Sequence, residues 1–235
     1  GFSRGTVDRV LNNRGKVKPE TEKIIREIAE QMNYKPNLAG KALAARKKSP
    51  VIGVITASDG NPFFEEVFHG IDNVADEVSH YGIKIVKRAM RGFNPENQLS
   101  LIRELREKEN INALILHPIS DHKIVDEINN LSDCAVPVIT LNTDIENSNR
   151  ICYVGSNYIQ GGEIACGMLG FITEKSANIG VFLGSDKILG HTQRLKGFEQ
   201  KAKKKFPNFK ICAISLTNDD DIIAYEETKK MLEQH

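Results

Sequence analysis

The residues best suited to chemistry in this sequence follow its apolar runs. Asn61-Pro62-Phe63-Phe64 comes after the run at 51–55, His117 follows the run at 113–116, and Asn142 follows the run at 136–141. In open parallel sheets, ligands bind beyond the carboxyl ends of the strands. Aromatic rings, amides and a guanidinium suit a small polyhydroxylated ligand. The sequence therefore predicts a ligand site that contains Asn61, Phe63, Phe64, His117, Asn142 and Arg194.

Four of these residues also have a purely structural interpretation. Phe63 and Phe64 are equally compatible with a hydrophobic core, and Asn142 is typical of a turn. Arg194 lies early in a predicted helix and fits an exposed helix face. The sequence alone leaves these alternatives open.

No known catalytic or phosphate-binding motif accompanies these residues. The sequence contains no G-x-G-x-x-G after a strand, no G-x-x-x-x-G-K-[ST], no G-x-S-x-G and no H-E-x-x-H. His117 and His122 are separated by a proline, so a helix cannot place them on one face as metal ligands. We therefore expect no catalysis, no metal and no cofactor.

Composition restricts where the protein functions. The 235 residues are 40% hydrophobic and 27% charged, and they contain no apolar run of about 18 residues that could span a membrane. The N-terminus has no pattern of a secretory signal, which predicts a cytoplasmic protein. Cys134, Cys152, Cys166 and Cys212 are widely spaced, which favours reduced cysteines buried as small apolar residues.

Charge is divided unevenly along the chain. Residues 1–50 carry 12 Lys and Arg against five Asp and Glu, a net charge of +7, whereas residues 51–235 carry 20 against 26, a net charge of −6. A basic segment attached to an acidic body indicates that the N-terminal segment meets a polyanion and that the body does not.

Two short amphipathic helices are predicted in the basic segment. Ser3 is placed to cap the first, whose apolar residues Val7, Val10 and Leu11 share one face. The second extends from Pro19 to Met32, with a buried face formed by Ile24, Ile25 and Ile28. Paired helices with basic outer faces are typical of a unit that places one helix in the major groove of DNA.

The segments SRGTVDRVLN and TEKIIREIAEQMNYKPNLAGKALA resemble the DNA-binding head of the LacI/GalR family of bacterial repressors. The resemblance implies that Arg4, Gly5 and Arg9 face base edges and that Ser3, Thr6, Asn12 and Lys16 lie near phosphates. It also implies a hinge helix within 37–44 that contacts DNA through Asn37, Ala39 and Leu43, with Leu43 in the minor groove. The family's head begins with one further helix, so we expect the chain to be part of a longer protein.

Strands and helices are predicted to alternate beyond Pro50. Apolar runs at 51–55, 83–86, 113–116, 136–141, 179–183 and 211–216, with a weaker run at 151–154, are separated by helical segments at 62–80, 95–109, 121–131, 157–174, 191–206 and 219–234. This alternation predicts an α/β fold with two lobes of parallel sheet behind an incomplete all-α helix-turn-helix head. The expected domains are the head and hinge (1–48), a first lobe (49–155) and an incomplete second lobe (156–235).

The body resembles the sugar-binding core that LacI/GalR repressors share with periplasmic sugar-binding proteins. The segments NPFF, HP, LN and R-x-x-G-F lie where those proteins line their cleft. The resemblance implies a repressor, as a homodimer on double-stranded DNA, whose operator affinity responds to a sugar, polyol or sugar phosphate. The alternative is a solute-binding protein for sugar uptake, which shares the body but would have a signal peptide in place of the basic head.

Overall fold

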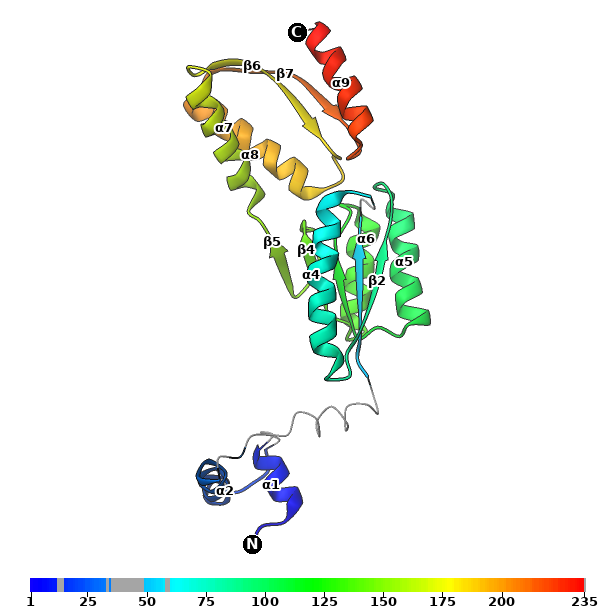
Figure 1. Ribbon diagram of the computed structural model, residues 1–235, viewed down its shortest axis with the longest axis vertical. Helices are drawn as coiled ribbons and strands as arrows, with labels where there is room; N and C mark the ends of the chain where they lie inside the picture. Colours follow the sequence, from blue (N-terminus) through cyan, green and yellow to red (C-terminus); the bar gives the residue numbers. More distant parts are fainter. Residues whose placement is uncertain (12–14, 33, 35–48, 58–59, 235) are drawn as a thin grey trace. The chain divides into compact units, whose positions relative to one another are not determined.

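The computed structural model describes residues 1–11, 15–32, 34, 49–57 and 60–234. The chain divides into two compact units, residues 1–44 and residues 45–235, and each is described by itself (Figure 1). Four residues of the predicted DNA contacts, Asn12, Asn37, Ala39 and Leu43, lie outside the described residues, as does the predicted hinge helix.

The N-terminal unit contains helices α1 (Arg4–Leu11) and α2 (Pro19–Gln31). Ser3 begins α1 as predicted, because its hydroxyl accepts a hydrogen bond from the backbone N–H of Thr6 at 3.2 Å. Val10 of α1 and Ile25 of α2 are buried, at 2% and 4% exposure. Each helix thus buries one apolar side chain, as expected for a pair of amphipathic helices.

The predicted buried face of α2 is wrong at two positions. Ile24 and Ile28 are 45% and 43% exposed, whereas Ile25 alone is buried. One helix of eight residues covers only a narrow stripe of its neighbour, and the stripe that α1 covers passes through Ile25.

The larger unit begins with a five-stranded parallel sheet in the order β2-β1-β3-β4-β5. The strands are β1 (Val51–Thr56), β2 (Lys84–Ala89), β3 (Ala113–Leu116), β4 (Val138–Asn142) and β5 (Cys152–Gly155). Helices α4 (Pro62–Ser79), α5 (Pro95–Lys108) and α6 (His122–Asp133) connect the first four strands (Figure 1). The parallel sheet with connecting helices confirms the predicted α/β class. We call residues 49–155 the five-stranded lobe.

A dense core holds this sheet to α5 and α6. Leu114 and Leu116 of β3, Ile102 and Leu105 of α5 and Ile128 of α6 are completely buried. The strand ends, and the loops that follow them, are therefore fixed by a rigid support.

The remaining described elements form what we call the two-stranded lobe, residues 156–234. They are α7 (Tyr158–Ile172), β6 (Ser176–Leu183), α8 (Leu189–Lys205), β7 (Asn208–Leu216) and α9 (Asp221–Gln234). β6 and β7 pair in parallel with an irregularity between Ile179 and Gly180. Their residues alternate between exposed and half-buried, in contrast to the fully buried residues of β1 and β3.

Helices α7 and α8 approach each other through two glycines. A Cβ atom on Gly162 would lie 1.9 Å from the backbone oxygen of Arg194, and one on Gly197 would lie 2.0 Å from the backbone oxygen of Ile159. Only glycine permits backbones to approach this closely. The crossing therefore fixes where the first turns of both helices lie.

The prediction of buried cysteines is correct only for Cys166. Cys134, Cys152 and Cys212 are exposed, and all four thiols are free. Cys152 and Cys212 lie at exposed positions of β5 and β7, where the alternation of a half-exposed strand turns them toward solvent.

Candidate functional site

The described DNA-contact candidates lie on or near the exposed surface of α1. Arg4, Gly5 and Arg9 are exposed, as are Ser3 before the helix and Lys16 after it, while Thr6 is half-buried. Arg9 Nε donates to the backbone oxygen of Gly5 at 3.1 Å, and the hydroxyls of Ser3 and Thr6 are 2.9 Å apart. The helix thus presents two guanidinium groups together with small residues that do not obstruct a close approach.

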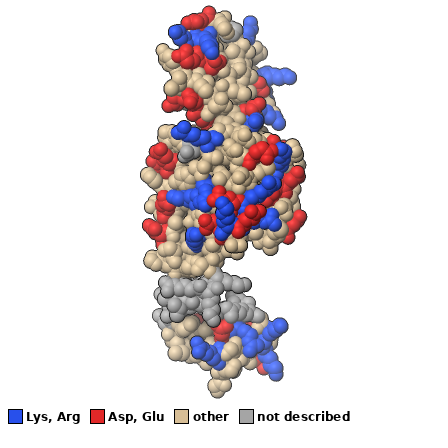
Figure 2. Space-filling view, turned by 90° about the vertical axis from the view of Figure 1, so that its right-hand side faces the viewer, with Lys and Arg blue, Asp and Glu red and all other residues tan. Residues whose placement is uncertain are grey.

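The body carries no comparable basic surface on the face that Figure 2 shows, where Lys and Arg alternate with Asp and Glu. Ion pairs join opposite charges in the five-stranded lobe, such as Lys84 with Glu109 at 2.9 Å and Arg88 with Glu104 at 2.9 Å. Such paired charges do not form a binding site for a polyanion.

The predicted ligand residues fall into separate groups, of which Asn61 is the first. Asn61 lines a cavity of about 730 Å³ that lies between the loop before α4, the end of β2 and the start of α9. Its side-chain oxygen also caps α4 by accepting from the N–H of Phe63 at 3.0 Å. Sequence reasoning missed the charged residues that share this cavity, which are Arg91, Asp219, Asp220 and Asp221.

The second group is aromatic. The rings of Phe63 and Phe64 meet edge to face at 5.2 Å, and Phe64 lies 4.9 Å from the imidazole of His117. Phe63 is 51% exposed, whereas Phe64 and His117 are buried. Phe63 therefore offers an accessible apolar surface, and the buried ring of Phe64 packs against it.

Burial fixes the protonation of His117. Burial, together with the smaller effect of the nearby His191, lowers the pKa of His117 to about 3. The imidazole is therefore neutral at neutral pH. Its Nδ1 accepts the N–H of Ala57 at 3.3 Å, which leaves the hydrogen on Nε2.

Gln98 holds the loop that carries His117. Its side-chain nitrogen donates to the backbone oxygen of His117, and its side-chain oxygen accepts from the N–H of Ile119, both at 2.9 Å. Gln98 is completely buried. The signal that could have identified Gln98 is a polar residue on the apolar face of a predicted helix, because a buried polar side chain needs hydrogen-bond partners.

The third group joins Asn142 to Arg194 through Tyr158. The hydroxyl of Tyr158 donates to the side-chain oxygen of Asn142 at 2.6 Å, and the guanidinium of Arg194 lies 4.8 Å from the centre of the Tyr158 ring. Asn142 adopts a positive φ of 63°, a conformation that asparagine tolerates better than most residues. Tyr158 was not predicted, because the strand that it follows, β5, is only a weak apolar run in the sequence, and because it matches no motif.

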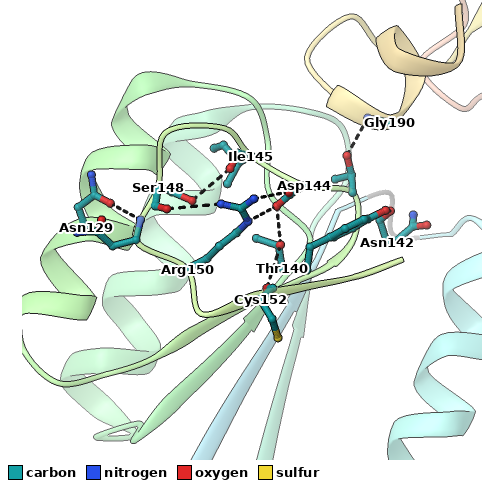
Figure 3. A network of polar contacts seen from close by, with 12 residues as sticks. Asn129, Thr140, Asn142, Asp144, Ile145, Ser148, Arg150, Cys152 and Gly190 are labelled. Carbon is teal, nitrogen blue, oxygen red and sulfur yellow. Dashed lines mark hydrogen bonds and ion pairs between the residues drawn. The ribbon is translucent and has the colours of Figure 1, made fainter. Parts of the chain in front are cut away.

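The loop after Asn142 is held by a polar network (Figure 3). Asp144 accepts from the hydroxyl of Thr140 at 2.8 Å and from Arg150 at 2.5 Å. Thr143 accepts the N–H of Gly190 at 2.9 Å, which joins this loop to the first turn of α8. The loop that carries Asn142 is thus tied to both lobes.

The three groups together supply several kinds of hydrogen-bonding side chain. Among the described residues, no three His, Cys, Asp or Glu come together as a metal site. None of the helices in the described ranges is long and apolar enough to cross a membrane. The neutral imidazole, amides and guanidinium provide hydrogen bonds to a polar ligand.

Two protein families match different parts of the chain. Residues 52–235 match the family described as periplasmic binding protein domain, and residues 1–37 match the bacterial regulatory proteins of the lacI family. The regulator MalR of Streptococcus pneumoniae is 30% identical over 209 residues, which cover 86% of this chain and 60% of that protein. Catabolite control protein A of Priestia megaterium is 29% identical over 84% of this chain and 57% of its own length.

The fold is also similar to that of solved sugar-binding proteins. GanP, a glucose-galactose binding protein from Geobacillus stearothermophilus, superimposes with a TM-score of 0.72 at 22% identity, over 80% of this chain and 65% of its own. At this identity the likeness concerns the fold alone. The chain spans about three-fifths of the length of the curated relatives it matches.

Proposed function

Because the chain belongs to the family of periplasmic binding protein domains and has a lacI-family match at its N-terminus, we propose that it is part of a DNA-binding transcriptional repressor. In this proposal a small sugar-like effector, bound between the two lobes, controls the affinity for the operator. The regulators to which the N-terminal match points are not enzymes. This role would place the protein in the cytoplasm.

The observation that carries the proposal is the combination of two units with different surfaces. Residues 4–11 present exposed arginines on a helix capped by Ser3. Residues 49–234 present amides, aromatic rings and a guanidinium near the ends of parallel strands. The first suits a phosphate backbone and base edges, and the second suits a polyhydroxylated ligand.

The proposed DNA contacts are those of α1 and its neighbours, together with the hinge residues outside the described ranges. One head covers few base pairs, so we propose a homodimer on a pseudo-palindromic operator. The proposed domain limits are 1–48, 49–155 and 156–235. The proposed effector contacts are Asn61, Phe63, Phe64, His117, Asn142 and Arg194, and the effector is a sugar, polyol or sugar phosphate.

A solute-binding protein for sugar uptake is the second candidate, favoured by the fold similarity to GanP. It has no use for an arginine-bearing N-terminal helix. Sequence-selective DNA binding therefore separates the two candidates.

The experiment is selection of bound sequences from a pool of random duplexes by the full-length protein. We expect a pseudo-palindromic consensus. Arg9→Ala should then weaken binding to that consensus by about 1–3 kcal/mol if Arg9 contacts a guanine. Arg26→Ala is the matched control, because Arg26 lies on α2 and pairs with Glu22 at 2.7 Å. Equal enrichment of all sequences would contradict the proposal.

A further inference from the structure

One side chain of the two-stranded lobe holds a side chain of the five-stranded lobe. Tyr158 is the first residue of α7, and Asn142 is the last residue of β4. The Tyr158 hydroxyl lies 2.6 Å from the side-chain oxygen of Asn142, a short hydrogen bond between partly buried groups. The bond spans 16 residues of sequence and crosses from one lobe to the other.

The surroundings of Tyr158 favour its hydroxyl as a donor to Asn142. Burial raises the pKa of Tyr158, while the charge of Arg194 and a hydrogen bond with its side chain partly offset the increase, so the phenol keeps its proton at neutral pH. Arg194, 4.8 Å from the ring centre, has hydrogen-bond donors only. A guanidinium beside the phenol therefore favours a hydroxyl hydrogen that points toward Asn142.

Close packing fixes the Tyr158 ring. A Cβ atom on Gly190 would lie 2.7 Å from a carbon of this ring, so the ring rests against the backbone of α8. The crossing of α7 and α8 at Gly162 and Gly197 places the first turn of α7 where the ring makes this contact.

A second tyrosine fixes the backbone on the other side of Asn142. The Tyr153 hydroxyl lies 2.8 Å from the backbone oxygen of Asn142 and 2.9 Å from that of Ser156. Asn142 is thus held by Tyr153 at its backbone and by Tyr158 at its side chain. The two contacts differ, because only the one to Tyr158 sets the orientation of the amide.

We propose that Tyr158 is a positioning residue that orients the amide of Asn142 and joins this candidate ligand contact to Arg194 on the opposite lobe. A ligand that needs the Asn142 side-chain oxygen must compete with the Tyr158 hydroxyl, and a ligand that meets Arg194 must share it with the Tyr158 ring. Occupancy of the site and the bonding between the lobes are therefore linked. The ligand role of Asn142 and Arg194 rests on the proposed function, whereas the positioning by Tyr158 does not.

The test is hydrogen exchange of single backbone amides, measured without ligand. Two amides donate between the lobes in bonds that do not include the Tyr158 hydroxyl: Gly190 N–H to Thr143 at 2.9 Å, and Ser120 N–H to the backbone oxygen of Lys187 at 2.7 Å. Tyr158→Phe removes the hydroxyl and keeps the ring against Gly190. We expect both amides to exchange about three- to ten-fold faster, the range for one lost hydrogen bond.

Tyr225→Phe is the matched control, because it makes the same change at a side chain that is 68% exposed on α9. Its exchange rates should equal those of the unmodified protein. Amides within the five-stranded lobe, such as that of Ile115 in β3, should be unchanged in both variants.

A second variant separates positioning from general support. Asn142→Gly removes the amide and tolerates the positive φ at this position. We expect the double variant Tyr158→Phe with Asn142→Gly to exchange no faster at Gly190 and Ser120 than Asn142→Gly alone, since both changes break the same bond. Unchanged exchange in Tyr158→Phe, additive effects in the double variant, or equal acceleration of all amides would each overturn the proposal. Failure of the full-length protein to bind DNA would overturn the proposed function and leave this result intact.

Discussion

The two lobes of the larger unit position their side chains by different means. In the five-stranded lobe the candidate residues follow strands whose neighbours, such as Leu114, Leu116 and Ile102, are completely buried. In the described part of the two-stranded lobe the buried apolar residues are Cys166, Ile188 and Ala202. There the position of Arg194 depends instead on the glycine crossing of α7 and α8 and on hydrogen bonds to the other lobe.

This difference predicts where substitutions act. Helix α7 of the two-stranded lobe carries exposed apolar side chains, such as Met168 at 64% and Phe171 at 90% exposure. Loss of a methyl group in the five-stranded lobe leaves a cavity, whereas loss of one on this surface of α7 does not. Stability should therefore depend mainly on the five-stranded lobe, whereas the geometry of the site should depend on both lobes.

The largest effect is expected from a cavity in the five-stranded lobe. Leu114→Ala removes a completely buried side chain of β3 and should lower the free energy of unfolding by about 2–5 kcal/mol. Phe171→Ala, at a position 90% exposed, should change it by about 0.5 kcal/mol or less. Urea titration of both variants measures the contrast. Similar losses would show that the lobes do not differ as described.

Adjacent glycines of α7 provide a sharper comparison within one helix. Gly162→Ala would place a Cβ 1.9 Å from the backbone of Arg194 and should cost about 1–3 kcal/mol by forcing α7 and α8 apart. Gly161 has nothing within 4 Å of its Cβ position, so Gly161→Ala should stabilise the helix by about 0.5–1 kcal/mol. Thermal unfolding of the two variants should move in opposite directions, and a shift of both in one direction would contradict the crossing.

Acid should reveal the buried imidazole of the first lobe. The pKa of His117 is lowered to about 3 in the folded protein, against 6.5 in the unfolded chain. Between these values the unfolded state binds more protons than the folded state. The part of the free energy of unfolding that depends on His117 is therefore complete above pH 6.5 and is lost as pH falls toward 3. The slope for one such group is roughly 1.4 kcal/mol per pH unit.

His117→Asn keeps an acceptor near Ala57 and removes the titration. Its stability should fall less steeply than that of the unmodified protein between about pH 6 and about pH 5 in urea titrations. His122→Asn is the control, because the side chain of His122 is 78% exposed. A His117→Asn variant with an unchanged slope would contradict the burial of a neutral imidazole.

The sequence predicted the five-stranded lobe more closely than the two-stranded one. The run Ala113–Leu116 coincides with β3, because a strand buried between helices is continuously apolar. β6 and β7 begin at Ser176 and Asn208, each three residues before the predicted start. Half-exposed strands include polar residues at alternate positions, which conceal their ends from an analysis of apolar runs.

Contacts between lobes could not be predicted in the same way. Asn142 and Arg194 could be selected from strand-end and helix positions. The hydroxyl that bonds Asn142 belongs to Tyr158, whose ring lies beside Arg194 and which follows only the weak apolar run of β5. The contact depends on a positive φ at Asn142 and on the approach of α7 to α8. Both are properties of the assembled lobes.

The smallest structural effect, with the most direct functional consequence, is expected at Arg194. Arg194 is exposed, so Arg194→Ala should leave the free energy of unfolding within about 0.5 kcal/mol. It should nevertheless abolish effector binding or separate it from DNA binding, because Arg194 is the one predicted contact from the second lobe. Lys196→Ala, which removes the same charge from an exposed position of α8, should leave both intact. Calorimetry with a panel of sugars, polyols and sugar phosphates measures binding.

The central claim is that a ligand between the lobes changes the affinity of the N-terminal unit for DNA. The most direct measurement is the operator affinity of the full-length protein, with and without each ligand that calorimetry identifies. A ligand that favours one lobe arrangement should change this affinity by about 5- to 150-fold, and Arg194→Ala should remove the change. A ligand that binds at saturation and leaves the operator affinity unchanged would contradict the account.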